Sequence, residues 1–323
     1  MYADLALIAV VTEAAIGYPD ALYRLIGHPV TWIGRLIAWC DKAWNSATDS
    51  FEERRWRGIY TLVLLLAVSI LSGMILTAAL THLFGGLAVL LAGVAGSSLL
   101  AQRSLHAHVA AVASALEAQG IEAGRRAVSM IVGRDTRALD EAAVSRAAIE
   151  SLAENFSDGI VAPLFWMVVG GLPGAIAYKA VNTADSMIGH KSERYLAFGW
   201  AAARFDDLIN LPASRLSALW FVLAAALSPG LSPRRALAVL FRDAGHHRSP
   251  NAGWPEAAMA GALGIQLSGP RIYDGQEVAE RWVGEGRRDL GAGDIRAALE
   301  LYRAACGLQI ATLVALVVVS LMF

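Results

Sequence analysis

Carboxylate and carboxamide side chains gather between residues 150 and 215 of an otherwise apolar chain. They form three groups: Glu150, Glu154 and Asp158; Asn182 and Asp185; and Asp206, Asp207 and Asn210. On a helix, spacings of three, four or eight residues put side chains on one face, so Glu150, Glu154 and Asp158 share one face, as do Asn182 with Asp185 and Asp206 with Asn210. Such hard oxygen ligands suit Mg²⁺ and, through it, a substrate that carries phosphate. The spacing therefore predicts an Mg²⁺ site built by neighbouring helices.

A purely structural interpretation of the same residues is also open. Ser151 and Glu154 fit the S-x-x-E capping box, in which Glu154 only satisfies backbone donors at the start of a helix. The other carboxylates can be helix caps or solvated faces. Polar groups near membrane segments are expensive to keep, however, and this favours a functional site for the three groups together.

The composition indicates a membrane protein. Of 323 residues, 56% are hydrophobic and 17% are charged, and the mean hydropathy is +0.48. Soluble domains carry about 25% charged residues. The net charge of −1 implies no nucleic-acid partner, whereas the apolar segments imply the lipid bilayer as one. No basic region opens the chain, so we expect no signal peptide.

The apolar segments predict a transmembrane hairpin and a C-terminal anchor. Residues 59–80 contain no charge and are long enough for a span of ~20 residues. Residues 83–101 predict a second span, and residues 81–86 the turn between them. Arginines flank the pair on both sides, so the positive-inside rule puts both flanks in the cytoplasm and the turn outside.

We expect an all-α, polytopic integral membrane protein, because strand-like alternation is nearly missing. Residues 1–323 are predicted to form a single membrane-embedded domain. Its parts are an N-terminal helix and interfacial segment (1–58), the hairpin (59–101), catalytic helices and loops (102–306), and a C-terminal transmembrane anchor (307–323).

Two apolar segments are ambiguous. Residues 159–177 are broken by prolines and glycines, and residues 216–228 are short. They form either two crossings or helices buried against the rest of the protein, and we favour buried or re-entrant helices. Residues 4–16 contain Glu13, which is either a functional group or a side chain in water on an interfacial helix.

Two polar stretches outside the three groups are candidates for phosphate. Arg134 lies in a polar turn in which Asp135 or Thr136 can cap the following helix. His247 and Asn251 precede a predicted helix at 256–267, whose start is a reasonable anion site. Residues 270–293 are expected to form a charged, glycine-rich loop.

Several expected motifs are absent. The chain has no G-x-x-x-x-G-K-[ST] loop and no G-x-G-x-x-G after a strand. Its two cysteines, Cys40 and Cys306, fit no zinc or redox spacing and are expected to be reduced and structural.

The chain resembles the adenosylcobinamide-phosphate synthases of cobalamin biosynthesis, the CobD/CbiB family. The matching stretches run from near the start to about residue 275. They are His28–Gly34, Val132–Thr136, Glu150–Gly159, Ala162–Trp166, Tyr178–Met187, Phe198–Arg204, Asp206–Asp207, Pro212–Leu216 and Ser249–Gly261. One departure lies near the start, where Glu13 stands for the family's Asp and Tyr18 for the Asp of its Gly-Asp-Pro. We assign Tyr18 no role.

The resemblance implies a ligase that joins adenosylcobyric acid to 1-amino-2-propanol O-phosphate or ethanolamine phosphate, driven by ATP. From the basic flanks of the hairpin we expect the protein in the bacterial cytoplasmic membrane with its active site facing the cytoplasm. Phosphoryl transfer depends mainly on positioning and charge neutralisation, which these residues can supply with Mg²⁺. The catalytic candidates are Glu150, Glu154, Asp158, Asp185, Asp206 and Asp207, with Glu150 as the candidate base. The metal candidates are Glu154, Asp158, Asp185 and Asp207. The substrate and phosphate candidates are Arg134, Lys179, Asn182, Lys191, Arg204, Asn210, His247 and Asn251.

Alternatives stay open at this point. Lys191 and Arg204 can instead snorkel to the membrane interface. A transporter of a small anionic solute would keep carboxylates and broken helices as well, although no inverted repeat is visible. After the ligase and the transporter, a non-catalytic membrane sensor on the same scaffold is the third class of function. The expected partners are the corrinoid, the aminoalkanol phosphate and the bilayer, with a second copy of the chain or other cobalamin-pathway enzymes as candidates.

Overall fold

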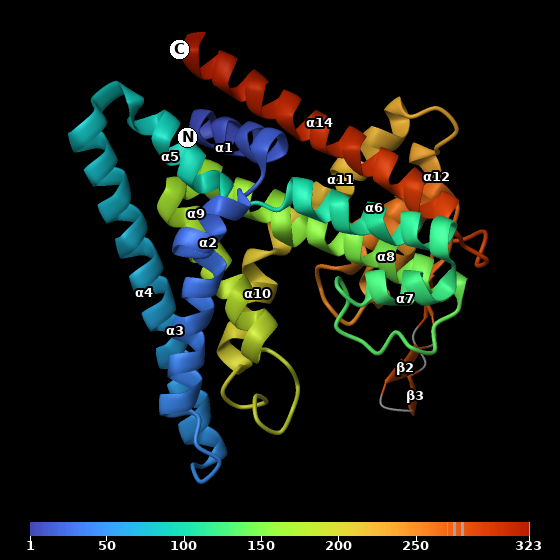
Figure 1. Cartoon of the computed structure of the whole chain (residues 1–323), viewed down its shortest axis with the longest axis horizontal. Helices are drawn as coiled ribbons and strands as arrows, with labels where there is room; N and C mark the ends of the chain where they lie inside the picture. Colours follow the sequence, from blue (N-terminus) through green and yellow to red (C-terminus); the bar gives the residue numbers. More distant parts are fainter. Residues whose placement is uncertain (270, 274–275, 279–280, 323) are drawn as a thin grey trace. The chain divides into compact units, whose positions relative to one another are not determined.

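The computed structural model describes residues 1–269, 271–273, 276–278 and 281–322. The described part is helical apart from two short antiparallel ribbons, which confirms the predicted fold class (Figure 1). Its contacts divide the chain into two compact units. The prediction of one domain over residues 1–323 stays a prediction, and the unit boundaries do not follow the four predicted segments.

The first unit holds residues 1–101, 162–210 and the end of the chain from Leu313. Its helices are α1 (Ala3–Ile16), α2 (Asp20–Ile26), α3 (Pro29–Trp44), α4 (Phe51–Phe84), α5 (Ala88–Ser97), α9 (Ala162–Ile188) and α10 (Trp200–Ile209), and a short 3₁₀ turn, η1 (Gly85–Leu87), joins α4 to α5. In Figure 1, α3 lies along α4. Apolar side chains of α3, α4, α9, α10 and the segment before α10 form a core that includes Ile37, Leu65, Ile188 and Phe198.

Close helix packing in the first unit depends on glycine. A Cβ on Gly58 would lie 1.9 Å from the carbonyl oxygen of Phe198, and one on Gly73 would lie 2.6 Å from the Cα of Pro173. Both glycines sit on α4, so their missing side chains let α4 touch α9 and the segment before α10. Opposite Gly73, α9 is broken, since Gly171 has φ +62° and Pro173 follows inside the helix.

The second unit holds residues 102–161 and 211–312. Its helices are α6 (Gln102–Gln119), α7 (Ile121–Val128), α8 (Glu141–Phe156), α11 (Leu211–Leu227), α12 (Pro233–Asp243), α13 (Gly253–Leu263) and most of α14 (Ala292–Met322), with a π turn, η2 (Ser157–Val161), and a 3₁₀ turn, η3 (Ala244–His246). The ring centroid of Phe156 on α8 lies 4.7 Å from that of Phe221 on α11 and 5.6 Å from that of Tyr302 on α14. Aromatic contacts therefore join these three helices.

The two ribbons overlap the stretch 270–293 that was expected to be a loop. Strand β1 (Leu267–Ser268) pairs with β4 (Trp282–Val283), and β2 (Arg271–Tyr273) pairs with β3 (Gln276–Val278), both antiparallel. The prediction of a loop over residues 270–293 is therefore wrong for β2, β3 and β4, and residues 270, 274–275 and 279–280 lie outside the described part.

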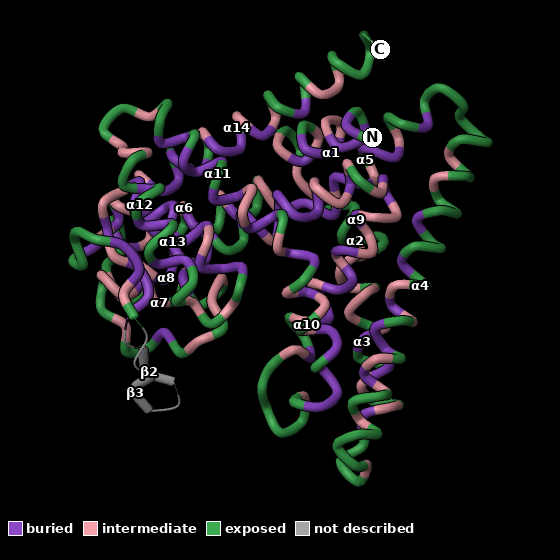
Figure 2. The backbone as a smooth tube through the Cα atoms, turned by 180° about the vertical axis from the view of Figure 1, so that it is seen from behind, coloured by how far each residue is buried: buried purple, intermediate pink, exposed green. Residues whose placement is uncertain are grey.

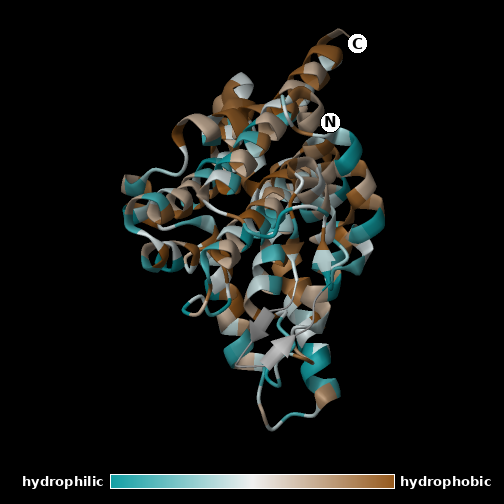
Figure 3. Cartoon of the chain, turned by 90° about the vertical axis from the view of Figure 1, so that its right-hand side faces the viewer, coloured by the Kyte–Doolittle hydropathy of each residue, from teal (hydrophilic) through white to brown (hydrophobic). Residues whose placement is uncertain are grey.

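Three described helical stretches are long and apolar enough to cross a membrane, and up to five if each bent pair is one span. In the most apolar windows of Phe51–Gln119 and Ala292–Met322, 22% of residues are buried, against 56% in Glu141–Ile188. Figure 2 shows the exposed stretches along α4 and at the end of α14, and Figure 3 colours the last turns beside the C label mostly hydrophobic. Apolar surface of this extent requires lipid, which indicates a membrane protein.

The second crossing predicted over residues 83–101 is wrong, because the helix in this stretch is too short to span a membrane. Its helix, α5, has 10 residues, or about 15 Å at 1.5 Å per residue, whereas the hydrocarbon core measures about 30 Å. Helix α5 instead packs against α1, where a Cβ on Gly93 would lie 2.6 Å from a methyl carbon of Ile8. The bend at Gly85, with φ +52°, ends α4 before the turn.

Three local expectations are also corrected. Glu13 is 3% exposed, so it does not lie in water on an interfacial helix. Ser151 and Glu154 lie inside α8, so they form no capping box. Helix α8 is capped by Asp140, which accepts a hydrogen bond from the N–H of Ala143 at 2.7 Å, and not by Asp135 or Thr136.

Candidate functional site

In the second unit, the carboxylate of Glu150 joins three segments that are far apart in the sequence. Its Oε2 pairs with Nη2 of Arg134 at 3.2 Å, and its Oε1 accepts the backbone N–H of Ser268 at 2.7 Å. The side chains of Arg134 and Glu150 are 13% and 8% exposed. A buried charge needs such partners, because its desolvation is otherwise uncompensated.

Arg134 is held in place by the loop between α7 and α8. The Thr136 hydroxyl donates to the carbonyl of Arg125 at 3.2 Å, and Nε of Arg125 donates to the carbonyl of Leu139 at 2.7 Å. From α8, the hydroxyl of Ser151 donates to the carbonyl of Ile131 at 2.9 Å. The loop that carries Arg134 is therefore fixed at both ends, which orients the guanidinium toward Glu150.

Ser268 has a backbone conformation that is rare for its residue type. Its φ is +58°, the one positive φ of a non-glycine residue in the described part of the chain. Such strain persists where surrounding contacts fix it, and it is common at functional sites. Here the N–H points to Glu150, while the hydroxyl donates to Oε2 of Glu256 at 3.3 Å.

Glu256 belongs to the first turn of α13 and is 2% exposed. Its Oε1 lies 3.8 Å from Nε2 of His247. Nδ1 of His247 accepts the N–H of Ser249 at 3.0 Å, so the ring proton belongs on Nε2, which faces Glu256. His247 thus lies beside a buried carboxylate at the helix start.

Asn251 has a structural partner in the same region. Its Oδ1 accepts the hydroxyl of Ser214 and Nη1 of Arg215, both at 3.0 Å. The Arg215 guanidinium also lies 4.4 Å from the ring centroid of Trp254. This oxygen therefore links α11 to the segment before α13. No sequence pattern singled out Arg215 as its partner.

The three carboxylates predicted to share a face on α8 differ in their surroundings. Glu150 is buried, Glu154 is exposed and Asp158 is half-buried. Asp158 lies in the π turn η2, where each turn of helix holds more residues than in an α-helix, so the expected spacing of eight residues no longer defines one face.

In the first unit, the other two predicted groups come together. Asp185 is on α9, Asp206 and Asp207 are on α10, and the charges of Asp185 and Asp207 both act on Asp206. Nδ2 of Asn210 donates to Oδ2 of Asp206 at 2.9 Å, and the Tyr178 hydroxyl donates to Oδ1 of Asn210 at 2.9 Å. The Asn182 side chain approaches the same carboxylate.

Asp206 is 8% exposed, yet its Oδ1 has no hydrogen-bond partner in the described part of the chain. Gly189 makes room for the neighbouring carboxylate, because a Cβ there would lie 2.0 Å from Oδ1 of Asp185. A buried oxygen without a donor, next to further carboxylates, suits a cation. Among the described residues, however, no group of three or more His, Cys, Asp or Glu side chains is arranged as a metal site.

The predicted basic residues of this unit lie at two places. Nη1 of Arg204 is 3.9 Å from Oδ2 of Asp207, and the charge of Lys191 acts on the same carboxylate. The charge of Lys179 acts instead on the imidazole of His28. His28 caps α3, because its Nδ1 accepts a hydrogen bond from the N–H of Val30 at 3.2 Å. The four predicted metal ligands are divided between the units, with Glu154 and Asp158 in the second and Asp185 and Asp207 in the first.

The comparisons with known proteins agree over nearly the whole chain. The family model described as CobD/Cbib protein matches residues 6–302. Proteins named "Cobalamin biosynthesis protein CobD" are similar to this chain: that of Rhodobacter capsulatus is 51% identical over 307 residues, covering 94% of each chain, and that of Sinorhizobium sp is 52% identical over 301 residues, covering 93% of each. That of Brucella suis is 48% identical over 316 residues, covering 97% of this chain and 96% of its own. No solved structure shows a significant match. The chain therefore belongs to the CobD/CbiB family of cobalamin biosynthesis proteins.

Proposed function

We propose that this protein joins adenosylcobyric acid to an aminoalkanol phosphate in an ATP-dependent reaction that yields adenosylcobinamide phosphate. The observation that carries the proposal is family membership over residues 6–302, a range that includes both polar clusters. The relatives are named for cobalamin biosynthesis, and amide formation is what the family resemblance implies. The amine donor is 1-amino-2-propanol O-phosphate or ethanolamine phosphate.

The chemistry requires activation of a carboxylate. Transfer of the γ-phosphoryl group of ATP to the corrinoid carboxylate gives an acyl phosphate and ADP. The amine nitrogen then attacks the carbonyl carbon, the C–N bond forms, the C–O bond to phosphate breaks, and inorganic phosphate leaves. The ammonium proton passes to a base. Positioning and neutralisation of phosphate charge are the protein's main contributions.

Asp185, Asp206 and Asp207 are the residues that we propose to hold Mg²⁺. The unsatisfied Oδ1 of Asp206 beside two further carboxylates supports this choice. Bound Mg²⁺ would neutralise charge on the phosphates of ATP. Lys191 and Arg204, which lie next to Asp207, are proposed to contact phosphate oxygens. Glu154 and Asp158 remain predicted ligands of the metal.

Glu150 is better suited to hold other groups than to act as the base. Both of its oxygens already accept hydrogen bonds, from Arg134 and from Ser268. We therefore propose that Glu150 positions the Arg134 guanidinium and the strained backbone at Ser268. The proton acceptor would then be another carboxylate.

The reaction can be tested with purified full-length protein in detergent. With Mg²⁺, ATP, adenosylcobyric acid and aminopropanol phosphate, we expect a corrinoid heavier by one dehydrated aminoalkanol phosphate, measured by mass spectrometry. Asp185→Asn and Asp207→Asn should each lower the rate roughly a hundredfold, or ~3 kcal/mol, because each removes one well-placed charge. Glu193→Gln removes an exposed carboxylate and serves as the control. Full activity of both Asn variants would contradict the assignment.

Binding of Mg²⁺ should be visible without turnover. We expect Mg²⁺ to raise the melting temperature of the wild type, corresponding to about 2.7 kcal/mol when its free concentration is one hundred times Kd. Asp206→Asn keeps the volume of the side chain but removes the buried charge, so this variant should melt at the same temperature with and without Mg²⁺. Asp20→Asn, at an exposed carboxylate of the same unit, should respond like the wild type. An undiminished Mg²⁺ response in Asp206→Asn would exclude this metal site.

We further propose that the protein lies in the bacterial cytoplasmic membrane with its polar clusters facing the cytoplasm. Arg54, Arg55 and Arg57 stand at the start of α4, and the second unit carries further arginines, and basic residues favour the cytoplasmic side. Single cysteines at Ser129 and Ser249, in a background lacking Cys40 and Cys306, should be protected from impermeant thiol reagents in intact cells. A cysteine at Thr81 should react. External labelling of Ser192→Cys would place the segment after α9 outside and contradict a cytoplasmic Asp185 cluster.

A further inference from the structure

The loop between α9 and α10, residues 189–199, folds back on itself within the first unit. Its two ends lie close together, because a Cβ on Gly199 would lie 1.6 Å from the carbonyl oxygen of Ile188, the last residue of α9. Inside the loop, the N–H of Tyr195 donates to the carbonyl of Ser192 at 3.0 Å. Compact surface loops whose ends lie close together are frequently functional.

The start of this loop adjoins the carboxylate cluster of the first unit. His190 acts electrostatically on Asp185, and the ammonium of Lys191 acts on Asp207. Across the loop, the ring centroid of His190 lies 6.5 Å from that of Tyr195. A contact made at Tyr195 is therefore passed to the part of the loop that lies beside the carboxylates.

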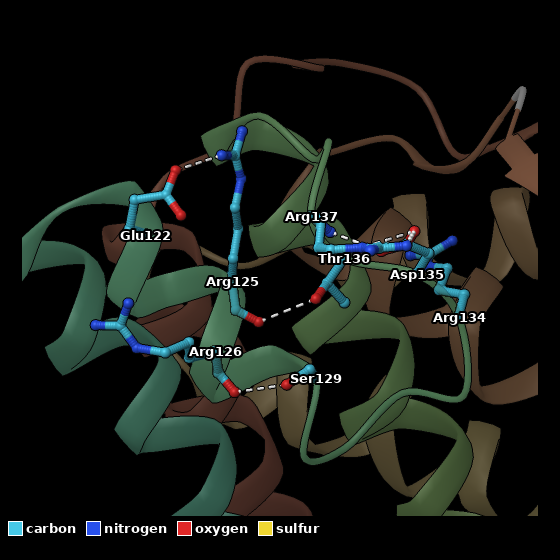
Figure 4. Close-up of a pocket in the computed structure, with 8 residues that line it drawn as sticks. All are labelled: Glu122, Arg125, Arg126, Ser129, Arg134, Asp135, Thr136 and Arg137. Atoms are coloured by element: carbon cyan, nitrogen blue, oxygen red, sulfur yellow. Dashed lines mark hydrogen bonds and ion pairs between the residues drawn. The ribbon is translucent and has the colours of Figure 1, made fainter.

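The end of the loop is attached to α3 by an ion pair. Nη2 of Arg194 donates to Oδ2 of Asp41 at 2.7 Å, and the Tyr195 hydroxyl donates to the same oxygen at 3.3 Å. This pair joins residues 153 positions apart, whereas in the pocket of Figure 4 Arg125 pairs with Glu122 three residues before it. The Asp41 side chain is 13% exposed, so its charge depends on these donors.

Two further side chains hold the backbone of the loop at the same place. Nδ2 of Asn45 donates to Oδ1 of Asp41 at 2.7 Å and to the carbonyl of Arg194 at 3.2 Å. Nη2 of Arg54 donates to the carbonyls of Glu193 and Arg194, and its Nε donates to Oδ1 of Asn45 at 2.9 Å. We call these contacts of Asp41, Asn45 and Arg54 with the loop the tether. It fixes both side chains and carbonyls of one short segment.

We propose that Asp41 is a positioning residue, which acts through Arg194 and Tyr195 to hold Lys191 where its ammonium contacts the phosphates of ATP. A loop that is already fixed loses less conformational entropy when a ligand binds. Loss of the tether therefore weakens the binding of ATP and leaves the chemistry at the bound phosphate unchanged. The nucleotide rests on the proposed function, whereas the tether rests on the contacts of the loop.

The positioning role can be tested by kinetics on the full-length protein in detergent. Arg194→Gln breaks the tether at a side chain that is 59% exposed, so the core should not be disturbed. We expect its KM for ATP to rise roughly tenfold while kcat stays within about twofold of the wild type, because only binding is affected. Asp41→Asn should behave alike, and the double variant should be no worse than either, since both act through one ion pair. Asp49→Asn, whose carboxylate pairs with Arg57 of α4 instead of with the loop, should keep the wild-type KM.

A second readout needs no turnover. The chain has three lysines, Lys42, Lys179 and Lys191, and the amines can be acylated and their labelling mapped by mass spectrometry. Mg²⁺ and ATP should slow the labelling of Lys191 in the wild type, whereas Lys42, an exposed residue of α3, is the internal reference and should be unaffected. Arg194→Gln should need roughly tenfold more ATP for the same protection, in line with its KM.

The two readouts separate the possible outcomes. If the wild type forms no amide, but ATP protects Lys191 and this protection weakens in Arg194→Gln, the positioning role stands and the proposed reaction fails. If the wild type forms the amide and Arg194→Gln keeps its KM and its protection, the reaction stands and the positioning role fails. A lower kcat at unchanged KM in Arg194→Gln, or a wild type in which ATP leaves Lys191 unprotected, would also overturn the proposal.

Discussion

A charged carboxylate inside an apolar protein must be compensated where it lies, and Glu150 imposes this constraint on the second unit. Desolvation of such an ion costs several kcal/mol unless partners replace its water. Arg134 and the N–H of Ser268 are those partners, and they come from segments 16 and 118 residues away. The loop before α8 and strand β1 are therefore fixed relative to α8 by one side chain. The positive φ of Ser268 is tolerated because Glu150 and Glu256 hold the residue on two sides.

The first unit contains a different arrangement of carboxylates. One oxygen of Asp206 accepts a hydrogen bond from Asn210, and the other has no donor among the residues that the structure describes. The charges of two further carboxylates act on it. Like charges in a buried site repel one another, and a cation relieves the repulsion. Glu150 is thus compensated by the protein itself, whereas Oδ1 of Asp206 has no donor among the described residues. This contrast is the physical basis for the proposals that Glu150 holds other groups and that Asp185, Asp206 and Asp207 bind Mg²⁺.

Helix periodicity accounts for what could be predicted from the sequence. It grouped Asn182 with Asp185 and Asp206 with Asn210, and the structure adds that both pairs adjoin the carboxylate of Asp206. Apolar length identified α4 and α14, since a single property of a continuous segment decides a span. The same criterion failed for residues 83–101, because a bend at Gly85 and packing of Gly93 on α1 depend on tertiary structure.

Residues that act through distant partners could not be found from local spacing. Ser268 reaches Glu150 only because β1 pairs with β4 and packs near α8. The π turn at residues 157–161 likewise changed the face of Asp158, although the sequence there continues a helical pattern. A signal that was available is the glycine at residue 189, four residues after Asp185, where a side chain would collide with the carboxylate.

The claim that Glu150 organises the second unit is tested most directly by a double-mutant cycle with Arg134. The measurement is the free energy of unfolding of the full-length protein in detergent, by urea, for Glu150→Gln, Arg134→Gln and the double variant. Each single substitution leaves a buried charge uncompensated and should cost about 3–5 kcal/mol. The double variant should be more stable than the sum of the single effects predicts, by at least ~1.5 kcal/mol, because neither charge then remains. Additive effects, with a coupling below ~0.5 kcal/mol, would show that the pair is incidental and contradict the account.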